Sequence, residues 1–145
     1  MVNPNDAIRF TNVVSKKYRF HYKNMDNIIK IFFRDLVSQK LTIKGPLFYS
    51  INNVPLDEMV NAEFFMPIAE DSIVEKDDLT FHSYFAIENM VSICLYHDFE
   101  RNTEFAYQLL LEYMDQHGLS PATPFFHVIS GDETLQYVYI KAGVA

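Results

Sequence analysis

The sequence has few of the residues on which secreted or phosphate-binding proteins depend. It contains one cysteine, Cys94, four glycines and no tryptophan among 145 residues. A single cysteine cannot form an internal disulfide, and four scattered glycines form no phosphate-binding loop. The N-terminus has no apolar signal segment, and no apolar run approaches the ~20 residues that span a bilayer. We therefore expect a cytoplasmic chain that does not enter a membrane.

Histidines and acids are present, but not at the spacings typical of metal or catalytic sites. The five histidines show no His-x-His or His-x3-His pattern, and the acids of residues 70–78 lack the spacing and central glycine of a calcium loop. His97 and Asp98 are neighbours near the end of a predicted strand, which would direct them to opposite faces. The sequence therefore predicts no metal, no cofactor and no catalytic residue, and hence a protein that is not an enzyme.

Charge is distributed unevenly along the chain. The net charge is −7, yet residues 1–44 have an excess of basic side chains, whereas residues 45–145 are acidic. The negative total repels phosphate and argues against direct nucleic-acid binding. Surfaces of opposite sign suit a protein partner or a homodimer. Solvated charge on separate surfaces of one domain is the simpler explanation.

Aromatic residues make up 15% of the chain, with 13 Phe and 9 Tyr, which indicates a folded protein with a large core. Apolar residues at helical spacing predict amphipathic helices over residues 25–41 and 102–119, the second ending at Gly118. An Asn-Asn-Val-Pro turn is expected at residues 52–55 and an acidic connection at residues 69–83. Apolar or alternating runs predict strands at residues 17–23, 47–51, 62–68, 85–97, 124–129 and 135–140, with an irregularity near Glu88 and Asn89.

The predicted elements occur twice in the same order. Half one spans about residues 10–68 and half two about residues 84–142 of a single domain, 1–145. A shift of 78 positions places Pro46 on Pro124 and Tyr49 on His127. The sequence therefore predicts an α+β fold: a tandem β-α-β-β duplication with pseudo-twofold symmetry, whose antiparallel sheet packs on two long helices.

Three runs resemble the GyrI-like domain, the bacterial effector-binding fold related to the haem-binding SOUL proteins. They are AEFFMPI (62–68), the helix AYQLLLEYMDQHGL (106–119) with the proline-led strand after it, and the closing LQYVYIKA (135–142). The resemblance covers most of residues 10–142 and implies a cleft between the halves that is lined by aromatic side chains, often with a buried glutamate. Family members are drug-sensing modules of transcription regulators, gyrase-binding inhibitory proteins or small-molecule hydrolases. The chain is also similar to small stand-alone proteins of Gram-positive bacteria, some encoded near type VII secretion genes.

The sequence departs from this family at the position of the glutamate. Relatives have Pro-x-x-Glu after the second helix, whereas this chain has histidine, in Pro124-Phe125-Phe126-His127. That replacement puts in doubt both the selection of cations and the hydrolytic chemistry that a buried carboxylate supports. Glu63, on the opposite strand face from Phe64, is the candidate substitute; an exposed glutamate on an edge strand is the alternative.

The remaining candidates are polar aromatic residues. His127 and its repeat counterpart Tyr49 suit the polar groups of a cleft, and Tyr18, Tyr137 and Tyr139 suit its walls; packing in the core is the alternative for each. We expect a non-enzymatic module that binds a small amphipathic or aromatic ligand in the cleft between the halves. The alternative is a protein-interaction module, such as an inhibitor, immunity factor or secretion-linked accessory protein. A hydrolase that uses Glu63 is the third hypothesis.

Overall fold

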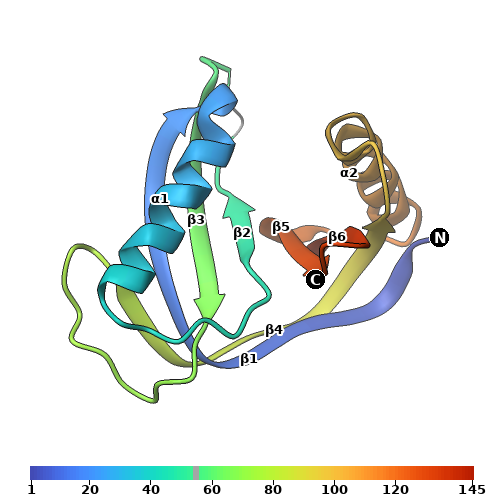
Figure 1. The fold of residues 1–145 in the computed structure, drawn as a ribbon. Helices are drawn as coiled ribbons and strands as arrows, with labels where there is room; N and C mark the ends of the chain where they lie inside the picture. Colours follow the sequence, from blue (N-terminus) through green and yellow to red (C-terminus); the bar gives the residue numbers. More distant parts are fainter. Residues whose placement is uncertain (54–55) are drawn as a thin grey trace. The chain divides into compact units, whose positions relative to one another are not determined.

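The computed structural model describes residues 1–53 and 56–145 and repeats one order of elements twice (Figure 1). The first repeat comprises β1 (Asn3–His21), the short 3-10 helix η1 (Tyr22–Asn24), α1 (Met25–Ser38), β2 (Phe48–Ile51) and β3 (Met59–Pro67). The second comprises β4 (Thr80–Leu95), α2 (Phe99–Gln116), β5 (Pro121–Gly131) and β6 (Gln136–Val144). The α+β class and the duplicated β-α-β-β order are therefore confirmed. Val54 and Pro55, from the predicted turn at 52–55, lie outside the described residues.

Strands β1 and β4 are longer than the sequence pattern predicts. β1 begins at Asn3, well before the predicted start at residue 17, and β4 begins at Thr80, inside the predicted connection. The first ten residues include a polar run, Asn3 to Asp6, followed by the adjacent apolar residues Ala7 and Ile8, so a sustained period of two is not visible there. Each long strand contains one asparagine with a left-handed backbone, Asn12 (φ 56°) and Asn89 (φ 56°). The irregularity predicted near residue 89 is confirmed.

The chain divides into two compact units. The α1 unit comprises residues 10–85, and the α2 unit comprises residues 1–9 and 86–145. Strands β1 and β4 therefore each contribute residues to both units. The positions of the units relative to one another are not determined.

In the α1 unit, β3 lies between β1 and β2 in an antiparallel ladder. Glu63 is opposite Lys17 of β1 and opposite Ser50 of β2. Because β3 has a neighbour on each side, it is not an edge strand. Pro67 is the last residue of β3 and the last to pair with β1, which agrees with the terminal position expected of a strand proline.

An aromatic core fills the space between α1 and the sheet of this unit. Phe64 is fully buried at its centre. Its ring centroid lies 5.6 Å from Tyr18, 6.2 Å from Phe20, 5.9 Å from Phe32 of α1 and 5.4 Å from Tyr49. The side chains on the α1 side of the sheet are therefore the ones that alternate with Glu63 along β3.

In the α2 unit, β6 pairs with both β4 and β5, and α2 packs on these strands. Gly118 follows the helix with a φ of +66°, and the N–H of Leu119 donates to the carbonyl of Met114 at 2.8 Å. This arrangement confirms the predicted helix end. The buried core of the unit consists of Val91, Ile93, Ala106, Leu110, Met114, Ile140 and Ala142. No helix in the described part of the chain is long and apolar enough to cross a membrane.

Candidate functional site

Three polar side chains from three strands meet on the sheet face that points away from α1. Ser15 of β1 is fully buried, and its hydroxyl donates to Oε2 of Glu63 on β3 at 2.8 Å. The same Oγ lies 2.9 Å from Nε2 of His82 on β4. A serine hydroxyl has one proton, so an Oγ that donates to the carboxylate accepts a hydrogen bond from the imidazole N–H. Ser15 thereby links the carboxylate to the imidazole.

The carboxylate of Glu63 is partly exposed and has no cationic partner in residues 1–53 and 56–145. Ser15 holds one of its two oxygens. Lys17, opposite in the strand register, is exposed and forms no ion pair with it. An ionised carboxylate that is partly removed from water and lacks a counter-charge favours the approach of a cation.

Aromatic rings gather on the same face of the sheet. The Phe65 ring, two residues along β3 from Glu63, lies 4.8 Å from Phe48 and 4.8 Å from Phe85. The half-buried His82 ring lies 6.1 Å from Phe65 and 5.7 Å from Phe85. Phe48 and Phe65 are buried, so the half-buried Phe85 and His82 are the rings of this cluster that a cation near the carboxylate can contact.

Sequence reasoning located one member of this cluster and missed two. Glu63 is on the face opposite to Phe64, as the alternation predicts, and the alternative of an edge-strand glutamate is excluded because β3 is internal. Ser15 precedes the predicted start of the first strand, and His82 lies in the segment that was interpreted as a connection. Ser15, Lys17 and Arg19 are polar residues at every second position, and this spacing is a signal that would have extended the predicted strand to include Ser15.

Tyr49 and His127, the predicted polar pair, each face the helix of their own unit. Burial, with a contribution from the charge of Asp26, raises the pKa of Tyr49 to about 12. His127 is 6% exposed, its Nε2 hydrogen-bonds the hydroxyl of Tyr107 on α2, and burial lowers its pKa to about 4. His127 is therefore a neutral core histidine at pH 7 with a side-chain partner. A role of the pair in ligand binding stays a prediction.

The three other predicted tyrosines lie in different units: Tyr18 is in the α1 unit, and Tyr137 and Tyr139 are in the α2 unit. Tyr18 faces α1, and burial, followed by the nearby negative charge of Asp35, raises its pKa to about 12. Tyr137 and Tyr139 share one face of β6, with ring centroids 5.7 Å apart, and Lys141 lies over the Tyr139 ring at 5.3 Å. Their roles in ligand binding also stay predictions.

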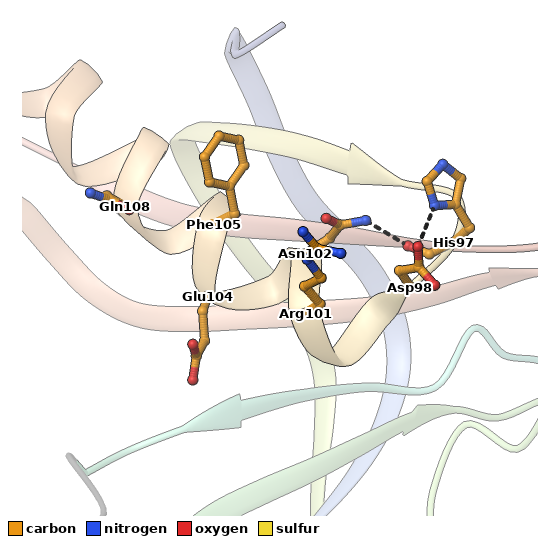
Figure 2. A pocket seen from close by; sticks show the side chains of 7 residues that line it. All are labelled: His97, Asp98, Arg101, Asn102, Glu104, Phe105 and Gln108. Carbon is orange, nitrogen blue, oxygen red and sulfur yellow. Dashed lines mark hydrogen bonds and ion pairs between the residues drawn. The ribbon is translucent and has the colours of Figure 1, made fainter.

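A surface hollow of about 490 Å³ lies at the start of α2 (Figure 2). His97 and Asp98 meet there at 3.4 Å, so their predicted divergence is wrong: β4 ends at Leu95, and Asp98 has a left-handed backbone. Both side chains are at least 70% exposed, and Figure 2 shows the Glu104 side chain directed away from them. In the described part of the chain, no three His, Cys, Asp or Glu residues are arranged to hold a metal ion. Among the described residues, the hollow therefore holds a single exposed His97–Asp98 ion pair and no metal-ligand cluster.

Several solved structures share this fold. EcmrR in its DNA complex matches with a TM-score of 0.73 and 15% identity over 97% of this chain, which spans 57% of the EcmrR chain. The C-terminal domain of EcmrR alone matches with a TM-score of 0.68 and 14% identity, over 97% of this chain and 96% of that one. The chain thus corresponds to little more than half of full EcmrR.

Two further matches are a hydrolase and a protein with a bound cation. A hydrolase from Listeria innocua matches with a TM-score of 0.61 and 9% identity, over 97% of this chain and 91% of its own. SAV2435 bound to tetraphenylphosphonium matches with a TM-score of 0.54 and 11% identity, over 95% and 93%. At these identities the likeness shows the GyrI-like effector-binding fold alone.

A comparison with curated proteins finds no match. A family model, in contrast, matches residues 9–145, nearly the whole chain. The protein therefore belongs to the family described as a domain of unknown function, DUF5085.

Proposed function

We propose that this protein is a non-enzymatic binding module for a small hydrophobic or aromatic cation, whose charge pairs with Glu63. The observation that supports this most directly is the carboxylate itself. It is held by Ser15 at 2.8 Å and forms no ion pair with a described residue. Phe65, two residues along the same face of β3, is buried against Phe48 and against the half-buried Phe85.

The physical reason is that a cation would make two kinds of favourable contact at this face. Pairing with the carboxylate offsets the cost of keeping that charge partly out of water, and opposite charges about 4 Å apart attract by roughly 1–4 kcal/mol, depending on how far water is excluded. The aromatic rings add attraction to a cation of about 0.5–2 kcal/mol, depending on desolvation. A neutral aromatic ligand gains the apolar contact but not the charge pairing.

The comparisons are consistent with this class of ligand. SAV2435, which has the same fold, is known with tetraphenylphosphonium bound, a permanent cation carrying four aromatic rings. That compound is a suitable first probe because its charge does not change with pH.

The arrangement of the cluster supports binding in preference to hydrolysis. In a serine hydrolase the histidine lies between the serine and the acid, so that it can accept the serine proton. Here the serine lies between the other two, its proton is directed to Glu63, and its side chain is fully buried. A buried hydroxyl that donates to a carboxylate is a structural linker and a poor nucleophile.

Replacing Glu63 by glutamine is expected to weaken tetraphenylphosphonium binding by about 10- to 100-fold, because the charge is lost while the amide oxygen can still accept from Ser15. Isothermal titration calorimetry at neutral pH measures the effect. Glu75→Gln is the matched control, since Glu75 is exposed and the net charge changes equally. Unchanged affinity in Glu63→Gln would remove Glu63 from the site, and absence of binding to the wild type would overturn the proposal.

A further inference from the structure

We propose that protons antagonise cation binding at this site, with His82 as the group that takes up the proton. The inference rests on the function proposed above and adds a mode of regulation to it. Its basis is geometric: the imidazole of His82 is joined to the ligand-pairing carboxylate by a single buried hydroxyl.

His82 is placed both to contact a ligand and to exchange protons with solvent. Its ring lies 6.1 Å from the buried Phe65 and 5.7 Å from the half-buried Phe85, so His82 and Phe85 form the accessible edge of this aromatic cluster. The side chain is half-buried, in contrast to Ser15 beside it. A ligand that pairs with Glu63 therefore lies within electrostatic range of the imidazole.

Two strands, β3 and β1, have charged side chains on the sheet face from which Ser15 bonds His82. β3 contributes Glu63, which the serine links to the imidazole. β1 contributes Lys17 and Arg19 on the same face, both exposed, and Arg19 is engaged by Asp57 at 3.1 Å. From β2, the residues opposite Phe65 and Glu63 are Phe48 and Ser50, which are uncharged. Glu63 is thus the carboxylate to which a charge on His82 couples.

Protonation of His82 changes the charge of the cluster from −1 to neutral. In the neutral form the imidazole N–H donates to Ser15, and Glu63 remains available to a cation. In the protonated form a positive charge lies at the edge of the site and repels the ligand, while its attraction for Glu63 competes with ligand pairing. Histidine is the side chain that undergoes this change between about pH 5 and pH 8.

The coupling is reciprocal by thermodynamic necessity. If a proton on His82 weakens cation binding, a bound cation must weaken proton binding by the same factor. Cation binding that displaces a proton from His82 is therefore accompanied by proton release. This release distinguishes a true linkage from a general loss of structure in acid.

The test compares tetraphenylphosphonium affinity at about pH 8 and about pH 5.5 in the wild type and in His82→Gln. Glutamine can still donate to Ser15 but does not titrate. We expect wild-type affinity to fall on the order of tenfold between these pH values. His82→Gln is expected to bind equally at both, and to release no protons when titrated in buffers of different ionisation enthalpy.

His97→Gln is the matched control, because His97 is an exposed histidine of the other unit; it should retain the wild-type pH dependence. Equal wild-type affinity at both pH values, or an undiminished pH dependence in His82→Gln, would overturn the inference while leaving the proposed function intact. Absence of binding at about pH 8 would overturn both.

Discussion

Replacing Phe64 by alanine is expected to lower the free energy of unfolding of the α1 unit by about 3–5 kcal/mol, the range measured for large-to-small changes of buried aromatic residues. Phe64 is fully buried, and its ring contacts Tyr18, Phe20, Phe32 and Tyr49. Truncation removes both the transfer free energy of the ring and its packing against four neighbours. A loss of this size is a large fraction of the stability of a typical domain.

Urea denaturation followed by far-UV circular dichroism measures the change, since the chain has no tryptophan for fluorescence. Phe105→Ala provides a matched control, because it makes the same substitution at a residue of α2 that is 58% exposed. Its effect is expected to stay within about 0.5 kcal/mol. Hydrogen exchange should show the loss of protection in residues 10–85. Similar losses in the two variants would contradict the assignment of Phe64 to the centre of the core.

Acidification is expected to destabilise the α2 unit through His127. Burial lowers the pKa of this histidine to about 4, whereas an unfolded histidine has a pKa of about 6.5. The unfolded state therefore binds a proton first as pH falls, so the stability that His127 contributes is complete above about pH 6.5 and declines toward pH 4. The expected loss between pH 7 and pH 4.5 is about 2 kcal/mol.

His127→Gln isolates this effect, because glutamine is neutral at all these pH values and can still hydrogen-bond the hydroxyl of Tyr107. Between pH 7 and pH 4.5, the unfolding free energy of the wild type should fall by about 2 kcal/mol more than that of this variant. His97→Gln, at an exposed histidine, is the control and should follow the wild type. A pH-independent difference for His127→Gln would show that the buried histidine does not titrate on unfolding.

The two repeats have diverged in charge at equivalent positions. The shift of 78 residues that pairs Pro46 with Pro124 also pairs Glu63 with Lys141. Lys141 is neutralised within its own unit by Asp6 at 3.1 Å, and Ser92 in turn donates to the same carboxylate. Glu63 is bonded by the Ser15 hydroxyl. The equivalent positions of the two repeats therefore differ in sign and in pairing: the lysine has a carboxylate partner, whereas the glutamate has no cationic partner among the described residues.

The pattern of apolar residues predicted most of the secondary structure because it reports burial over short distances. Phe32 and Leu36 share one face of α1, and Leu110 and Met114 share one face of α2, so the helical period is visible without knowledge of what the helices contact. The strand pattern placed Glu63 opposite to Phe64 for the same reason. In residues 3–12 of β1, Ile8 alone is buried, so this segment shows no sustained alternation of apolar and polar side chains.

The sequence by itself determined the α+β class, the repeated β-α-β-β order and the face of β3 on which Glu63 lies, since each follows from local periodicity. The tertiary structure alone decided which side chains meet. Ser15 is 48 residues from Glu63 and 67 residues from His82 along the chain, and their contacts depend on the register of three strands. Likewise, the strand pattern left His127 open as a pocket residue or a core residue, and its neutral state follows from the packing of α2, which brings Tyr107 to its imidazole.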